Sequence, residues 1–135
     1  MNITYDDLKK CRDAKKEIRE LENRIIERRS SIERMTPIIT GMPKTKNGGN
    51  SIEDGVIKLV DEAMQWEEKV EERRQLIQRV HEAIFQLSGQ QQRILTLRYI
   101  DAYTWDRISS LMSYDRRWCT RLHKRALNEL GIRDA

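Results

Sequence analysis

Residues 104–130 read TWDRISSLMSYDRRWCTRLHKRALNEL, and this stretch decides the fold of the C-terminal part of the chain. Thr104 and Asp115 are residue types that favour helix N-termini, so the stretch predicts a short helix over 105–112 and a longer one over 116–130. The turn Ser113-Tyr114 separates them. A short helix, a tight turn and a longer basic helix together form a helix-turn-helix.

The longer predicted helix has an apolar side and a basic side. The apolar residues recur at helical spacing and are expected to face the core: Cys119, Leu122, Ala126, Leu127 and Leu130. The other side carries Arg116, Arg117, Thr120, Arg121 and Lys124, and residues 116–125, which also include Arg125, contain no acid. Such a helix fits the DNA major groove with its first turns on base edges, where arginine reads guanine. This basic cluster therefore predicts binding to double-stranded DNA.

The residues just before this stretch extend the predicted DNA-binding domain to 88–135. Leu87-Ser88-Gly89 interrupts a long helical pattern, and Ser88 is expected to cap a helix from Gln90 to Ile100. The turn Asp101-Ala102-Tyr103 then leads to Thr104.

The N-terminal part, residues 1–87, has heptad repeats typical of coiled coils. Thr4 with Asp7 resembles a capping box and begins the first helix, whose seam consists of Cys11, Ala14, Ile18, Leu21, Ile25, Arg28, Ile32 and Met35. Ser51 is expected to cap a second helix that continues to Leu87 with a matching seam. The first helix is expected to end at Thr36-Pro37, because proline disfavours helix before it. Residues 36–51 are then a linker containing two prolines and three glycines.

The packing of the two long helices stays open at this stage. The second helix carries 5 bases and 9 acids over residues 51–87, whereas the first has more bases than acids, which favours packing of one on the other. An antiparallel hairpin within one chain is the simplest arrangement. The linker is also long enough for parallel packing, and two hairpins could pair into a homo-oligomer. The predicted class is all-α, an antiparallel coiled-coil hairpin followed by a helix-turn-helix domain.

The composition argues against enzymes, metal proteins and membrane proteins. The sequence shows no glycine-rich phosphate loop, nucleophile elbow or convincing acid–base pair, and no apolar run of membrane-spanning length. Cys11 and Cys119 lie at apolar positions of helical patterns, and His81 and His123 have no companion ligands nearby in the sequence. We therefore expect a cytoplasmic protein without catalytic activity, cofactor or metal.

The C-terminal sequence resembles region 4 of sigma-70-type factors, which reads the upstream promoter element. The resemblance covers roughly residues 80–130 and is carried by Leu87-Ser88, Gln92–Tyr99, Thr104–Ile108 and Arg125–Leu130. The whole chain is similar to the ArpU/RinA-like transcriptional regulators of phages and prophages. That family shares a coiled-coil N-terminal half, a stretch like Met35-Thr36-Pro37…Gly41-Met42-Pro43, and a Thr-Trp start to the second helix of the module.

The resemblance implies roles for individual residues. Arg116, Arg117 and Arg121 stand at base-reading positions, and Thr120 and Lys124 at phosphate-contacting ones; we also assign Arg125 and Thr104 to the DNA-binding surface. Trp118 stands where sigma factors carry a polar or basic residue, so it would either touch DNA or pack on the preceding helix. Asp115 stands at the capping position, Ser113 replaces the usual turn glycine, and Arg117 replaces a common glutamate.

Four functions fit these patterns. The leading interpretation is a sequence-specific activator of phage late genes that acts with the RNA polymerase holoenzyme of a bacterial host and lies on the nucleoid when bound. The alternatives are a sigma-like polymerase subunit, a DNA-packaging recognition protein of the small-terminase type, and a coiled-coil interaction protein whose basic helix is only solvated. The chain has no counterpart of the sigma region that binds the polymerase clamp and melts the promoter.

Overall fold

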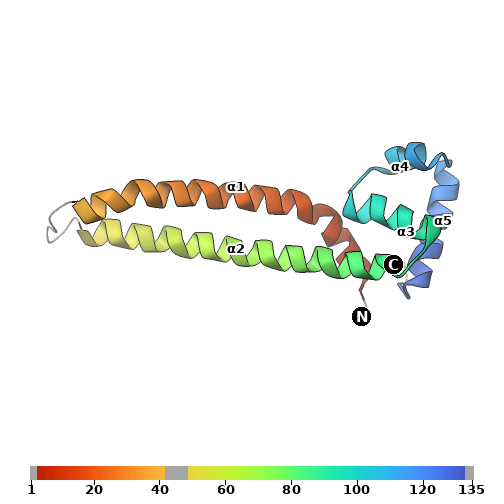
Figure 1. Cartoon of the computed structure of the whole chain (residues 1–135), viewed down its shortest axis with the longest axis horizontal. Coiled ribbons are helices and arrows are strands. Elements are labelled where there is room, and N and C mark those ends of the chain that lie inside the picture. Colours follow the sequence, from red (N-terminus) through yellow and green to blue (C-terminus); the bar gives the residue numbers. More distant parts are fainter. Residues whose placement is uncertain (1–2, 42–48, 133–135) are drawn as a thin grey trace. The chain divides into compact units, whose positions relative to one another are not determined.

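The computed structural model describes residues 3–41 and 49–132, with side chains described at 3–35 and 53–132. Within these ranges every regular element is helical and there is no strand, which confirms the all-α prediction. The elements are α1 (Tyr5–Gly41), α2 (Gly49–Phe85), α3 (Gly89–Leu95), the π-helix η1 (Thr96–Ile100), α4 (Trp105–Met112) and α5 (Arg116–Glu129). Figure 1 labels the α-helices.

Helix α1 begins with the predicted capping box. The Thr4 backbone N–H donates to Asp7 Oδ2 at 3.0 Å, and the Asp7 N–H donates to Thr4 Oγ1 at 3.1 Å. Ser88 takes the predicted N-cap position of α3 with extended backbone, but its side chain makes no capping hydrogen bond. Capping at α3 thus rests on backbone conformation, whereas at α1 the side chains satisfy backbone N–H groups.

The predicted end of the first helix at Thr36-Pro37 is wrong. Helix α1 continues through Pro37 to Gly41, and α2 begins at Gly49, two residues before the predicted cap Ser51. Proline removes one helical hydrogen bond and crowds the preceding turn, so it marks a frequent helix boundary without forbidding a longer helix. The rest of the predicted linker, residues 42–48, lies outside the described residues.

The chain divides into two compact units. The core unit contains residues 1–15 and 73–135, and the helix-pair unit contains Lys16–Glu72. The division therefore falls inside α1 and inside α2. As a consequence, the predicted helix-turn-helix domain shares its unit with the first turns of α1 and the last turns of α2.

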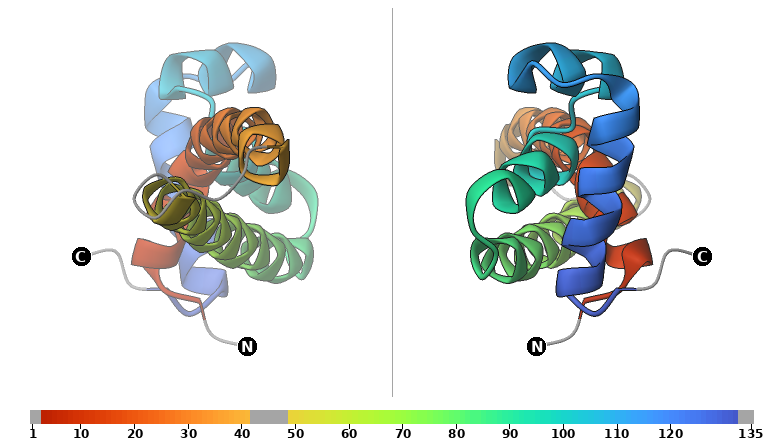
Figure 2. Two further views of the ribbon diagram at one scale, coloured as in Figure 1. Left: turned by 90° about the vertical axis from the view of Figure 1, so that its left-hand side faces the viewer. Right: turned by 90° about the vertical axis from the view of Figure 1, so that its right-hand side faces the viewer.

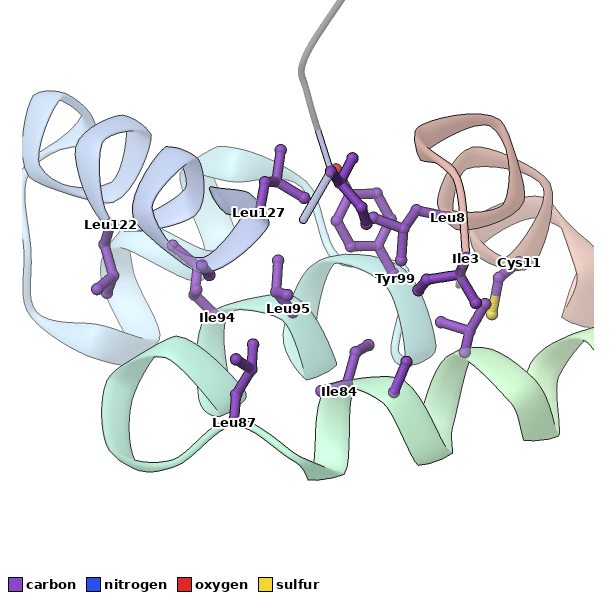
Figure 3. Packing of buried hydrophobic residues seen from close by; sticks show 14 of the residues in the cluster. Ile3, Leu8, Cys11, Ile84, Leu87, Ile94, Leu95, Tyr99, Leu122 and Leu127 are labelled. Carbon is purple, nitrogen blue, oxygen red and sulfur yellow. The ribbon is translucent and has the colours of Figure 1, made fainter. Parts of the chain in front are cut away.

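One continuous apolar cluster lies at the centre of the core unit. It joins Ile3, Leu8 and Cys11 with the end of α2 and with α3, η1, α4 and α5. Figure 3 shows Leu8 beside Tyr99, and Leu87 and Ile94 nearer to Leu122. Leu8, Ile94, Leu95 and Ile108 are completely buried. The N-terminal segment is thus part of the core that supports the C-terminal helices.

Tyr99 connects three segments of the core unit. It lies on η1, which replaces the last turn of the helix predicted over residues 90–100 and ends where the Asp101 N–H donates to the Thr96 carbonyl. The buried Tyr99 hydroxyl shares a 2.7 Å hydrogen bond with His123 Nε2 on α5. Burial raises the pKa of Tyr99, and the hydrogen-bonded Tyr5 at the start of α1 raises it further. The buried hydroxyl is thereby satisfied, as a polar group in a core must be.

In the helix-pair unit, α1 and α2 run antiparallel. Arg28 Nε lies 3.2 Å from Glu62 Oε2, while Met35, further along α1, approaches Gly55, further back along α2. Arg28 breaks the apolar seam, yet its guanidinium lies 5.4 Å from the centre of the Trp66 ring. A cation on an aromatic face keeps the seam packed while the charge stays at the surface.

Candidate nucleic-acid interface

The segment from α4 to α5 is held by local hydrogen bonds at both helix starts. Thr104 Oγ1 accepts from the Arg107 N–H at 3.2 Å, and Asp115 Oδ1 accepts from the Trp118 N–H at 2.7 Å, so both predicted caps are confirmed. In the right-hand view of Figure 2, α4 lies next to the end at which α5 begins. The caps define where each helix starts and therefore the direction of its first turns.

The turn between α4 and α5 uses a left-handed residue. Ser113 has φ 57° and ψ 37°, and its N–H donates to carbonyls of the last turn of α4. The Ser109 hydroxyl bonds to the Tyr114 carbonyl and closes the turn from the other side. A residue with a Cβ adopts this conformation at a cost that glycine avoids. The turn was expected to need a residue with positive φ, and Ser113 is that residue.

One side of α5 is buried in the core unit. Cys119, Leu122, Ala126 and Leu127 are buried as predicted, and Leu130 is half-buried. The sequence did not indicate that His123 is also buried, where it bonds to Tyr99 and lies edge-on to Trp105 with ring centres 4.8 Å apart. His123 lies four residues after Cys119 and three before Ala126, and this spacing places it on the same side of the helix as those buried residues. These contacts fix α5 against its neighbours.

The opposite side of α5 carries a stripe of basic side chains. Arg117, Arg121 and Lys124 are all exposed, and their i, i+4, i+7 spacing places them in one row along the helix. Asn128, also exposed, continues the row. No acid lies on α5 before Glu129. We call Arg117, Arg121 and Lys124 the basic stripe; it presents three cations to solvent from a helix whose other side is anchored.

Arg116 and Thr120 lie beside the stripe and already have partners within the protein. Arg116 Nη1 is 3.2 Å from Asp106 Oδ1 of α4, in an exposed ion pair. The Thr120 hydroxyl donates to the Arg116 carbonyl at 2.9 Å. Thr120 would have to rotate its hydroxyl before it could donate to a phosphate, whereas Arg116 has further N–H groups available.

Trp118 and Arg125 form a separate group on the other flank of α5. The Trp118 ring meets Tyr114 edge-on at 6.0 Å, and the Arg125 guanidinium lies 5.6 Å from its ring centre. Trp118 nevertheless remains 37% exposed. Its packing partner belongs to the turn that precedes α5, not to a helix. A supported but accessible indole can still contact a ligand with its outer edge.

Three arginines outside α5 were not singled out from the sequence. Arg107 of α4 is exposed and lies 4.7 Å from the Tyr103 ring centre, and Arg93 of α3 donates to the Leu111 carbonyl at 3.3 Å. Arg98 is half-buried over Trp105, donates to the Tyr103 carbonyl, and has its pKa lowered mainly by burial and then by Arg12. Arg98 and Arg93 thus tie the helices together, while Arg107 adds an exposed cation next to the capping residue Thr104.

Other kinds of site find little support in the described part of the chain. There, no three His, Cys, Asp or Glu residues gather in a way that could hold a metal ion. Among the described helices, none combines the length and apolar character needed to cross a membrane. Burial raises the pKa of the Cys119 thiol, and the Asp115 carboxylate raises it further, which leaves that thiol poorly suited to nucleophilic chemistry.

A scan against protein-family models finds no matching family, and searches of curated proteins and solved structures find no similar protein.

Proposed function

We propose that this protein is a sequence-specific, double-stranded-DNA-binding regulator of transcription, in which α4 and α5 act as a helix-turn-helix. The observation that carries the proposal is the basic stripe. Three exposed cations follow one row of a helix that is capped by Asp115, buried on its other side and preceded by a tight turn. This is the arrangement with which a recognition helix enters a major groove.

Some side chains of α5 would contact the DNA bases and others the phosphates. Arg117 and Arg121 are long enough to place two parallel N–H donors on O6 and N7 of guanine, which gives about 1–3 kcal/mol of discrimination per contact. Lys124, two turns from the helix start, would contact a phosphate and add affinity without sequence preference. Asp106 holds Arg116 toward α4, so Arg116 would contact the DNA beside the stripe.

The proposed partner in transcription is the RNA polymerase holoenzyme of a bacterial host. The resemblance of residues 80–130 to sigma region 4 supports an upstream promoter contact. The antiparallel pairing of α1 with α2 supports an antiparallel coiled-coil hairpin in place of the sigma regions that bind core polymerase. We therefore favour an activator in the bacterial cytoplasm, of the phage late-gene type, over a sigma-like subunit.

The test is a binding titration on sequences selected from a random DNA pool, measured at several salt concentrations. Arg121→Ala should cost about 1–3 kcal/mol on the selected site and relax the preference at one base pair. Lys124→Ala should weaken binding to all sequences about equally and lower the salt slope by about one. Lys58→Ala, which removes an exposed cation from the helix-pair unit, serves as the charge-matched control.

The proposal fails if the parent selects no sequence at low salt. It also fails if Arg117→Ala, Arg121→Ala and Lys124→Ala all bind like Lys58→Ala.

A further inference from the structure

The helix-pair unit exposes large apolar side chains that its own two helices do not cover. Ile26 of α1 is 62% exposed, and on α2 the exposed fractions are 58% for Ile57, 37% for Val60 and 55% for Met64. Beside them is a hollow of about 180 Å³, lined by Arg29, Ile32, Glu33, Val60, Ala63 and Met64. Clustered exposed apolar residues next to a hollow indicate an interaction surface.

These residues share one face of the helix pair. On α2, Ile57, Val60 and Met64 each follow a seam residue by one position. On α1, Ile26 and Arg29 likewise follow the seam residues Ile25 and Arg28. In an antiparallel pair, rows displaced in the same sense from both seams lie on the same side. The ion pair between Arg29 and Glu67 joins the two rows across that side. We call this side the apolar face, although the same rows also hold Arg19, Glu22, Glu33, Glu67 and Glu71.

The opposite side is polar. Within residues 16–35 and 53–72, the residues that precede the seam positions are Glu17, Glu20, Arg24, Glu27, Ser31 and Arg34 on α1 and Gly55, Lys58, Glu62, Gln65, Lys69 and Glu72 on α2. None of these is a large apolar residue. The polar side is therefore typical of a surface exposed to solvent, whereas the apolar face is typical of a surface that contacts another protein. Helix α2 has an apolar stripe wider than a two-helix seam requires, which is typical of helices that pack on two neighbours in a bundle.

We propose that the apolar face binds the same face of a second copy of this chain, forming a two-fold four-helix bundle. Charge selects the pairing. Residues 53–72 of α2 carry 2 bases and 8 acids, whereas residues 16–35 of α1 carry 6 bases and 5 acids. The arrangement that lays α1 of each copy over α2 of the other avoids facing two acidic helices. Such an isologous contact closes at two copies.

The size of the face suits a dimer. Twenty described residues in each helix span about 30 Å, and two helices side by side are about 20 Å wide. The contact would bury roughly 600 Å² per copy, or about 1,200 Å² in total, at the lower limit of stable protein interfaces. We therefore expect a dimer that dissociates on dilution.

The experiment is sedimentation equilibrium of the full-length protein without DNA over a range of concentrations, so its outcome is independent of the proposed DNA binding. The parent should approach twice its chain mass of 16.1 kDa as concentration rises. Met64→Glu should raise the dimer dissociation constant roughly a hundredfold or more, because symmetry places an unpaired carboxylate in the contact twice. Gln65→Glu introduces the same charge one residue away, on the polar side, and should change the dimer dissociation constant little.

A second measurement separates dissociation from unfolding. Both variants alter exposed positions, so both should keep the helical circular dichroism of the parent. A parent that stays at 16.1 kDa at every concentration would overturn the proposal, and the face would then belong to a different protein. Equal dissociation constants for folded Met64→Glu and Gln65→Glu would also overturn it.

Discussion

Replacing Leu8 with alanine should destabilise the C-terminal helices, although Leu8 is far from them in the sequence. Its side chain is 0% exposed and belongs to the apolar cluster that includes Tyr99 and Leu127. The substitution removes three carbon atoms, worth about 2 kcal/mol of transfer free energy at roughly 0.8 kcal/mol per methylene. The cavity adds to this, so the free energy of unfolding should fall by about 3–5 kcal/mol.

The loss should appear both in denaturant titrations and in amide hydrogen exchange. Exchange in α3 and α5 should accelerate along with exchange in the first turns of α1, because one cluster supports all three. Leu111→Ala is the matched control: Leu111 lies in the same unit but is 43% exposed, so its loss should cost about 1 kcal/mol or less. The reasoning is refuted if Leu8→Ala costs no more than Leu111→Ala, or if only the amides of α1 exchange faster.

Three further predictions follow from the turn, the buried thiol and the aromatic residues. Ser113→Gly should raise the free energy of unfolding by about 0.5–1 kcal/mol, measured by urea titration, because glycine relieves the left-handed strain at φ 57°; a loss of stability would contradict this. Burial raises the pKa of Cys11 from 9.0 to about 11. Between these pH values the thiol ionises in the unfolded chain but stays neutral in the folded one. The free energy of unfolding should therefore be unaffected by this thiol below pH 9.0 and should fall as the pH rises above it. Denaturant titrations across that range should show a smaller decline for Cys11→Ala. Run-off transcription should be stimulated only when both this protein and a primary sigma factor accompany core polymerase. Melting the promoter costs about 1.4 kcal/mol per base step, and the aromatic side chains that could capture unstacked bases, Trp105 and Trp118, already pack against neighbouring rings. Transcript from core polymerase and this protein alone would instead favour a sigma-like subunit.

Local chemistry was readable from the sequence where a feature depends on few neighbouring residues. Thr4 with Asp7, Thr104 and Asp115 cap their helices as predicted, since a cap needs only a side-chain oxygen and an N–H three residues away. The apolar side of α5 followed from spacing alone. The same spacing placed the basic stripe on the other side, so the candidate interface was largely predictable from the sequence.

Features set by competing or distant interactions were not readable. The passage of α1 through Pro37 depends on a balance between one lost hydrogen bond and the cooperativity of the remaining helix, which residue type alone does not decide. The π-helical turn at η1 aligns Tyr99 with His123 and Tyr5, two partners that are far away in the sequence. The Asp106–Arg116 pair likewise required the relative position of α4 and α5.

The division of the chain into units has a physical reason that also explains the role of its N-terminus. Residues 88–135 number only 48, and a domain of that size buries too little apolar surface to be more than marginally stable by itself. The core unit meets this limit by adding Ile3, Leu8 and Cys11 from the chain start and Leu76, Val80 and Ile84 from the end of α2. The heptad pattern does not predict this contribution from the chain start, because Cys11 fits a two-helix seam as well as a larger core. Since α5 is anchored through that shared cluster, the orientation of the basic stripe depends on residues at both ends of the chain.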